Sequence, residues 1–217
     1  YYRDTNTEHI VVNNGYDEEK LEKAHTRKDS AVSIFKKEVF SLYYAGVLYE
    51  NGRDVMPIFS ALATIKEKVK VPFELVFQGA GNGAEFKSDI ERMGLEGNIR
   101  FLPPVSMDDA LVNMLNADAL VLIQDEIFNS QVPGKIYEYI ATNKRILLKT
   151  PQGSATDSAM KEQKGVFQCY EKNDIEKRLL MLFQEKDLFT RGDSVKEFSR
   201  VKQSNGLVGL SNRLIGK

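Results

Sequence analysis

The chain has 217 residues, of which 42% are hydrophobic and 28% charged, with 30 basic and 31 acidic side chains. This length supports one sizeable hydrophobic core with short extensions. A net charge of -1 gives no overall attraction to nucleic acid, so nucleic acid is not an expected partner. The single cysteine, Cys169, excludes a disulfide framework, argues against a cysteine-based zinc site and fits a reducing compartment. No apolar run approaches the roughly 18 residues that span a bilayer.

The first 35 residues are polar and charge-rich, apart from an apolar run at residues 9–12. That run predicts an edge strand, closed by a turn over residues 13–15, and a short helix is expected over residues 17–27. The chain opens Tyr1-Tyr2-Arg3 without a methionine, so we expect it to be part of a longer protein. Residues 1–35 are interpreted as an arm or linker from a preceding domain.

From residue 36 onwards, apolar strands alternate with longer segments of helical periodicity. Predicted strands cover residues 39–45, 73–77, 99–102, 119–123, 145–149 and 165–169. Predicted helices cover residues 53–69, 84–93, 107–116, 133–141, 154–163, 173–184 and 194–215. This alternation indicates an α/β fold with a doubly wound, Rossmann-like parallel sheet covered on both faces. We expect the domain to span residues 36–190, with a C-terminal helix in residues 191–217 that packs toward a missing domain.

Ligands of doubly wound sheets bind beyond the carboxyl ends of the strands, where the strand order reverses. The loops after the predicted strands are therefore the candidate site. They cover residues 46–53, 78–83, 103–107, 124–135 and 150–154. Several of them place glycines before a helix, and a helix N-terminus suits phosphate because its N–H groups are unpaired.

Residues 79–84, G-A-G-N-G-A, nearly match the dinucleotide fingerprint G-x-G-x-x-G/A. The match follows the second regular strand rather than the first, and the next helix is strongly charged. No acidic residue ends a strand about 20 positions later, as the fingerprint requires. The sequence therefore disfavours NAD or FAD. It leaves two readings open: a tight turn, or a glycine-lined wall of a sugar-nucleotide pocket.

Residues 133–141, P-G-K-I-Y-E-Y-I-A, follow the most apolar predicted strand and open a helix. Lys135 falls in the first turn, where its ammonium group and free N–H groups could meet one phosphate. Glu138, three residues later, shares that helix face, and its carboxylate could accept hydrogen bonds from two ribose hydroxyls. The alternative is a solvated lysine and a glutamate placed favourably near a helix N-terminus.

This segment resembles the P-x-K-x-x-E-Y-x-A signature of many group 1 glycosyltransferases of the GT-B fold. Further blocks agree in order and spacing. They are N-G-Y-D at residues 14–17, Y-A-G-V-L at 44–48, N-G-R at 51–53, F-Q-G-A-G at 77–81, I-R-F-L-P-P-V at 99–105, N-A-D at 116–118 and P-Q-G-S at 151–154. Each block is loose, but their joint order is specific, and the resemblance covers about residues 9–185.

The resemblance implies the C-terminal, nucleotide-sugar-binding half of a bacterial, cytoplasmic glycosyltransferase of polysaccharide biosynthesis. Such an enzyme, of hexosyltransferase type, moves a sugar from a UDP- or GDP-sugar to a hydroxyl, with retention of configuration. A glycan or lipid-linked acceptor would bind the missing N-terminal domain, and the intact enzyme could associate peripherally with the inner face of the membrane. We expect the fragment alone to bind nucleotide weakly and to transfer no sugar. No metal or cofactor is expected, because cations and helix N-termini offset the charge of the leaving diphosphate.

The resemblance also assigns roles to residues. Glu138 would hold the ribose hydroxyls, Arg53 and Lys135 would face the diphosphate, and backbone groups near Val105 and Ser106 would hold the base. Further binding candidates are Gly46, Gly79, Gly81, Pro133, Gly134, Tyr139, Gly153 and Ser154.

Two departures from the family pattern keep rival functions in view. Ser130 stands where many relatives carry another glutamate, and Val47 stands where an arginine often follows the glycine. Both would suit a non-catalytic Rossmann-like binding module. A nucleotide-sugar epimerase is the other rival; it would show a histidine or carboxylate cluster, but both histidines, His9 and His25, lie in the N-terminal arm.

Overall fold

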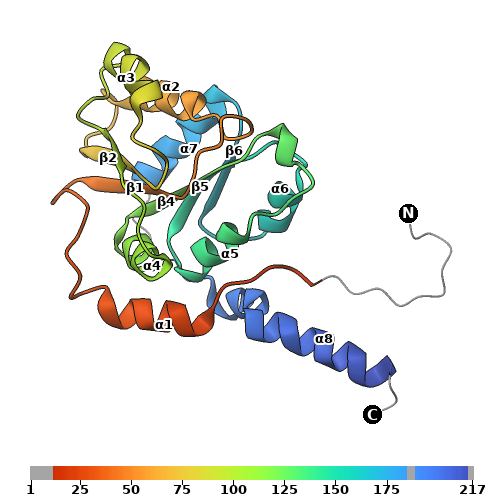
Figure 1. Ribbon diagram of the computed structural model, residues 1–217. Coiled ribbons are helices and arrows are strands. Elements are labelled where there is room, and N and C mark those ends of the chain that lie inside the picture. The colour runs from red at the N-terminus through yellow and green to blue at the C-terminus, as the bar shows by residue number, and fades with distance from the viewer. Residues whose placement is uncertain (1–11, 185–188, 215–217) are drawn as a thin grey trace.

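The computed structural model describes residues 12–184 and 189–214, so nearly all of the strand predicted at residues 9–12 lies outside the described residues. Six parallel strands form one sheet in the order β3-β2-β1-β4-β5-β6 (Figure 1). The strands are β1 (Phe40–Ala45), β2 (Phe73–Gln78), β3 (Ile99–Leu102), β4 (Ala119–Ile123), β5 (Arg145–Lys149) and β6 (Val166–Cys169). The doubly wound parallel sheet is thus confirmed, and every strand predicted after residue 35 is found.

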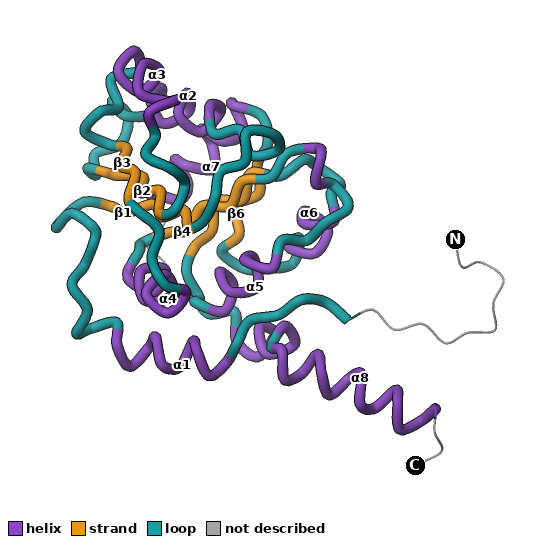
Figure 2. Tube along the Cα trace, viewed as in Figure 1, coloured by secondary structure: helices purple, strands orange, loops and turns teal. Residues whose placement is uncertain are grey.

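Helices cover both faces of this sheet (Figures 1 and 2). One face carries α2 (Met56–Ile65), α3 (Lys87–Arg92) and α7 (Lys172–Gln184), and the other carries α4 (Met107–Asn116), α5 (Gly134–Ala141) and α6 (Ala155–Met160). Outside these layers lie α1 (Glu18–Arg27), which packs on α4, and α8 (Arg200–Leu214), which extends away from the sheet. In the described parts of the chain, no helix combines the length and apolar character needed to cross a bilayer.

The strands have a hydrophobic core on each side. On one side Phe59 and Leu62 of α2 and Leu179 of α7 meet the sheet, and on the other Leu111 of α4 and Ile140 of α5 do so. All five residues of β4 are buried, as its unbroken apolar run predicted. A strand with both faces covered cannot shift without exposing apolar surface, so the carboxyl end of β4 is a fixed platform.

Side-chain caps set the starts of α1, α4 and α6. The Ser106 hydroxyl accepts the Asp109 backbone N–H (3.1 Å) at the start of α4, and Asp17 and Ser154 cap α1 and α6 in the same way. The predicted start of α2 at Arg53 is wrong by three residues, since the helix begins at Met56. The Asp54 backbone N–H instead donates to Asp125 Oδ2 (2.6 Å), which holds residues 53–55 as a loop beside the site.

The predicted helix over residues 194–215 is interrupted at Ser199, between the 3₁₀ segment η3 (Gly192–Phe198) and α8. Residues 15–17 and 198–200 lie side by side there. The Tyr16 backbone N–H donates to the Phe198 carbonyl (3.1 Å), and the Arg200 N–H donates to the Tyr16 carbonyl (3.0 Å). This pairing holds Ser199 extended, with φ -73° and ψ 146°. A long-range contact therefore overrides the helical periodicity. The helix predicted over residues 84–93 is also divided, into the 3₁₀ segment η1 (Ala84–Phe86) and α3.

Candidate functional site

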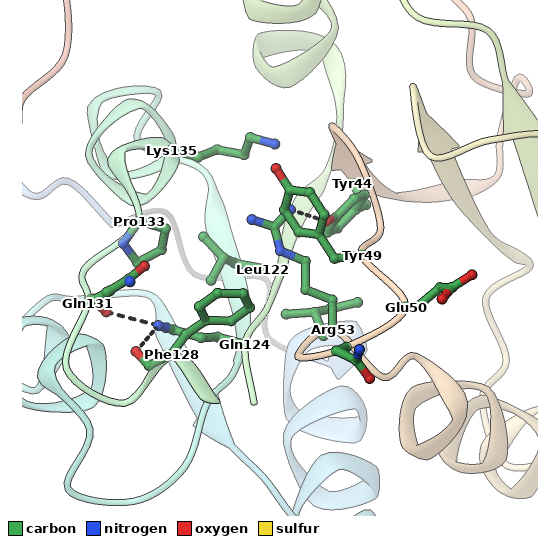
Figure 3. Close-up of a pocket in the computed structure, with 12 residues that line it drawn as sticks. Tyr44, Tyr49, Glu50, Arg53, Leu122, Gln124, Phe128, Gln131, Pro133 and Lys135 are labelled. Atoms are coloured by element: carbon green, nitrogen blue, oxygen red, sulfur yellow. Dashed lines mark hydrogen bonds between the residues drawn. The ribbon is translucent and has the colours of Figure 1, made fainter. Parts of the chain in front are cut away.

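The strand order reverses between β1 and β4, which lie side by side at the centre of the sheet. The chain leaves β1 toward α2 on one face and leaves β4 toward α5 on the other, so the two connections diverge and open a crevice. A pocket of about 650 Å³ lies there (Figure 3). It is lined by Tyr44, Tyr49, Glu50, Asn51, Arg53, Leu122, Ile123, Gln124, Phe128, Gln131, Pro133 and Lys135. We call it the main pocket.

Arg53 reaches into the main pocket from the loop between β1 and α2. Its Nη1 donates to the Val47 carbonyl (2.6 Å) and to the Tyr44 hydroxyl (3.1 Å), and its guanidinium carbon lies 4.5 Å from the ring centroid of Tyr49. Glu50 points away from it (Figure 3). Among the described residues Arg53 has no carboxylate partner, so its charge is held in place but not neutralised by the protein.

Lys135 points toward Arg53 from the first turn of α5 (Figure 3). Its Nζ lies 5.4 Å from the ring centroid of Tyr44. Burial and, secondarily, the charge of Arg53 lower the pKa of Lys135 to about 8. In the described parts of the chain, Lys135 also forms no ion pair. Two cations that face one cavity without carboxylate partners are chemically suited to an anion.

Glycines let the backbone approach this pair. Gly46, directly after β1, has φ +116°, and a Cβ there would overlap with Nζ of Lys135. A Cβ on Gly79 would lie 3.8 Å from Cα of Gly46 and 3.5 Å from Cβ of Pro104. The ends of β1, β2 and β3 therefore meet beside Lys135, as the loop positions in the sequence suggested.

Glu138 lies on the same helix as Lys135 but lines a different, smaller pocket of about 70 Å³. Its neighbours there include Lys20, Met107 and Arg200. Burial raises the pKa of Glu138, while Lys135, Arg200 and Lys20 oppose that rise. Its carboxylate forms no ion pair or side-chain hydrogen bond with the described residues. The two side chains that the sequence placed on one helix face thus line separate pockets, although they remain close enough to interact electrostatically.

The remaining candidates are spread over several parts of the fold. Val105 is exposed and Ser106 caps α4, both next to Met107 of the smaller pocket. Pro133 lines the main pocket, whereas Gly134 packs against the Asn14 side chain.

Three candidates lie elsewhere. A Cβ added to Gly81 would have Oε1 of Glu85 as its nearest contact, at 4.0 Å. Gly153 lines a separate hollow at the ends of β5 and β6, and Ser154 caps α6 beside it. These glycine and serine positions are therefore not part of the main pocket.

Tyr139 has a structural position. It is fully buried, and its hydroxyl accepts the backbone N–H of Ala45 (3.2 Å). The contact ties α5 to the end of β1 and so fixes the spacing between Lys135 and Gly46. Tyr139 would therefore influence a ligand in the main pocket only indirectly, by holding α5 against the end of β1.

Nine of the twelve residues that line the main pocket were not named as site residues in the sequence, and three of them matter most for its geometry. Tyr44 and Tyr49 flank the cations, and Gln124 lies buried at the end of β4. Gln124 did carry a signal, since it is the first polar residue after a wholly apolar strand. Tyr49 carried none, because its position over Arg53 depends on how the loop folds.

Residues 12–184 and 189–214 contain no group of three or more His, Cys, Asp or Glu side chains arranged to hold a metal ion. His25 lies on α1 and does not line the main pocket.

The fold and the crevice together define a Rossmann-like α/β domain with a pocket lined by two cationic side chains at its switch point. No family model and no curated protein matches the sequence. Solved structures share the fold. A glycosyltransferase from Rickettsia africae has a TM-score of 0.66 and 14% identity, over 95% of this chain and 57% of that one. HepE from Anabaena, solved in complex with UDP, has a TM-score of 0.69 and 14% identity, over 94% and 57%.

A third structure belongs to another class. A putative UDP-N-acetylglucosamine 2-epimerase from Listeria monocytogenes has a TM-score of 0.55 and 14% identity, over 83% of this chain and 47% of that one. The chain thus spans about half the length of these structures. The likeness confirms the fold expected from the sequence: a doubly wound, Rossmann-like α/β domain, which matches about half of each of these longer chains.

Proposed function

We propose that the chain is the nucleotide-sugar-binding half of a glycosyltransferase. The observation that carries the proposal is the pair of cations, Arg53 and Lys135, which share the switch-point pocket without a carboxylate partner among the described residues. A diphosphate is the anion that such a pair suits, because two fixed cations can each meet one phosphate. Two proteins with this fold, HepE from Anabaena and MnaA from S. aureus, were solved with UDP, which supports a nucleoside diphosphate rather than free phosphate.

In this proposal the donor lies across the first turns of α5. The base lies near Val105 and Ser106, the ribose hydroxyls bond to Glu138 and the diphosphate lies between Lys135 and Arg53. The sugar then occupies the rest of the main pocket. The two cations stabilise the negative charge that develops as the diphosphate departs, so they accelerate transfer without a metal ion.

The intact enzyme would transfer a hexose to an acceptor hydroxyl held by a second domain, with retention of configuration. We further propose a glycan or lipid-linked acceptor and a cytoplasmic location at the inner face of the membrane. The tied segments at residues 15–17 and 198–200 would lead toward that second domain. The fragment alone would then bind nucleotide but transfer no sugar.

The second candidate is a nucleotide-sugar epimerase, which the Listeria structure supports at the level of fold. The main pocket argues for transfer instead, since its one lining carboxylate, Glu50, points away from the cations (Figure 3). Incubation of the protein with UDP-N-acetylglucosamine, followed by chromatography of the product, separates the two. Accumulation of the 2-epimer over repeated turnovers would support an epimerase and contradict the transferase proposal.

Calorimetric titration with UDP, GDP and ADP tests the binding proposal. We expect one of the three to bind, and Arg53→Ala to weaken its affinity by roughly 30-fold, because a charge-assisted contact contributes about 2 kcal/mol. Glu138→Ala should weaken it by roughly 10-fold through the lost ribose bonds. Arg92→Ala, which removes an exposed ion pair on α3, is the matched control and should leave affinity unchanged. Failure of all three nucleotides to bind would favour a non-catalytic module.

Nucleotide affinity should also depend on pH through Lys135. With a pKa of about 8 in the free protein, the amine is charged below that pH and becomes neutral above it. A bound diphosphate favours the charged amine, so affinity should be flat up to about pH 8 and then fall by up to about tenfold per pH unit. Calorimetry between pH 7 and 9.5 measures this, and Lys135→Met should flatten the profile. A wild-type profile that stays flat to pH 9.5 would contradict the assignment.

A further inference from the structure

Gln124 has an unusual position at the end of β4. It is 3% exposed, and its Nε2 donates to two carbonyls of the following loop, those of Phe128 (2.7 Å) and Gln131 (2.9 Å) (Figure 3). Its Oε1 is buried and accepts no hydrogen bond from the described residues. An unpaired buried acceptor destabilises the fold by about 1–3 kcal/mol, and the two donated bonds offset that cost. The amide group therefore donates both of its hydrogen bonds to the loop, while its own oxygen is left without a donor among the described residues.

The loop that Gln124 holds forms one wall of the main pocket. Phe128 and Gln131 both line the pocket. The outer side of the same loop bonds to α6, since the Asn129 carbonyl accepts the Ala155 N–H (2.7 Å) and the Gln131 carbonyl accepts the Thr156 hydroxyl (2.9 Å). Gln124 thus holds the inner side of this pocket wall, and α6 holds its outer side.

The opposite side of the pocket depends on the same wall. A Cβ on Gly52, which has φ +90°, would overlap with the side chains of Ile127 and Phe128, so the β1–α2 loop packs directly against it. The Gly52 carbonyl also accepts the Asp125 N–H (3.0 Å). A displacement of Phe128 would therefore change the shape of the pocket beyond the cations.

The order of groups in a nucleotide sugar decides which part of the ligand meets this wall. With the ribose at Glu138 and the diphosphate at Lys135 and Arg53, the sugar falls in the part of the main pocket walled by Phe128 and Gln131. We infer that Gln124 is a positioning residue for the donor sugar. It sets the wall that the sugar contacts without being a catalytic residue itself. This inference rests on the proposed function and adds to it a determinant of sugar recognition.

Calorimetry on the full chain with paired ligands tests the inference: UDP with UDP-glucose, and GDP with GDP-mannose. Gln124→Met keeps the length of the side chain but removes both donated bonds. It should weaken binding of the nucleotide sugar by about fivefold to tenfold while changing affinity for the free diphosphate by less than about twofold. Gln168→Met is the matched control, because Gln168 Nε2 also donates to a backbone carbonyl, that of Asp157 (2.7 Å), but lies outside the main pocket. It should change neither affinity.

The outcomes separate the inference from the proposed function. Equal loss for both members of a pair, or no loss for either, overturns the role of Gln124 while nucleotide binding stands. Absence of any diphosphate binding by the wild type overturns both. If Gln124→Met does not fold, hydrogen exchange of the wild type decides: UDP-glucose should protect amides of residues 126–132 more than UDP does. Equal protection by the two ligands would overturn the inference.

Discussion

Replacement of Lys135 by methionine should stabilise the fold and weaken nucleotide binding at the same time. The folded protein lowers the pKa of this amine from 10.5 to about 8 because the site desolvates it beside Arg53. Folding therefore disfavours the charged form, and methionine retains most of the packing of the stem. Because Lys135 is only half-buried, solvent screening limits the gain in unfolding free energy to about 1–2 kcal/mol.

The sign of this effect follows from the two protonation states. Below about pH 8 the amine is charged in both folded and unfolded chains, so the cost to the fold is fully present. Above pH 10.5 it is neutral in both and the cost vanishes. In urea unfolding, Lys135→Met should therefore gain the most unfolding free energy at pH 7 and the least near pH 10. Affinity for the nucleoside diphosphate should fall by about 30-fold to 100-fold at pH 7, because a charge-assisted contact is lost.

Lys144→Met is the matched control for this experiment. Burial also lowers the pKa of Lys144, but this residue precedes β5, at the opposite end of the sheet from the main pocket. The control should gain stability in the same direction and leave nucleotide affinity unchanged. A Lys135→Met protein that is less stable than the wild type, or one that binds nucleotide equally well, would contradict the assignment of this residue as a ligand-binding cation.

A side chain that lowers the stability of the fold but strengthens ligand binding is expected at a site that is already formed before its ligand binds. Arg53 and Lys135 repel each other in a partly buried pocket, and no described carboxylate neutralises them. The strain is tolerated because β1 and β4 are held by the two hydrophobic cores. A diphosphate would then recover as binding energy what the empty site costs the fold.

Arg53 also accounts for one departure from the glycosyltransferase pattern. The enzymes that the sequence resembles often carry an arginine directly after the first loop glycine, where this chain has Val47. In the structure Nη1 of Arg53 donates to the carbonyl of Val47 (2.6 Å). The guanidinium therefore lies beside the position at which the arginine is missing. This geometry favours a retained anion site over a degenerate module.

The strands could be predicted closely because each one is a short, mostly apolar run, and glycine or proline directly follows β1, β2 and β3. β4 illustrates this: five consecutive apolar residues can be satisfied only by burial on both faces, and burial fixes their position in the sheet. The cap at Ser106 also depends only on short-range chemistry, because its hydroxyl bonds within its own helix. The break at Ser199 could not be predicted, because its cause is a pairing with Tyr16, 183 positions away along the chain.

The candidate site was predictable to the level of its loops. The carboxyl ends of the strands had to meet at one edge, which brought Gly46, Gly79 and Lys135 together. Helical spacing of three residues placed Lys135 and Glu138 on one face of α5. That face borders two pockets, and Lys135 lines one of them while Glu138 lines the other. Which pocket each side chain enters depends on packing against the N-terminal arm and α4, and no local pattern encodes that.

Gly46→Ala should separate backbone strain from ligand binding at this site. Alanine at φ +116° is strained, and its Cβ would displace the amine of Lys135. The amine is the mobile end of a flexible side chain, so it can move, and the loss in unfolding free energy should stay near about 1–2 kcal/mol. Affinity for the nucleoside diphosphate should nevertheless fall by roughly tenfold or more, because Lys135 no longer faces Arg53.

The control for this substitution is Gly94→Ala, since Gly94 has φ +65° and no other atom lies within 4 Å of the position that an added methyl group would take. It carries a comparable backbone penalty at a distance from the pocket, so urea unfolding should show a similar loss while calorimetry shows unchanged affinity. Equal affinities for the two alanine variants would mean that the position of Lys135 does not govern binding. A loss of affinity in Gly46→Ala alone would mean that the glycine after β1 is required for binding. The reason would be that the amine of Lys135 occupies the space that a side chain at Gly46 would take.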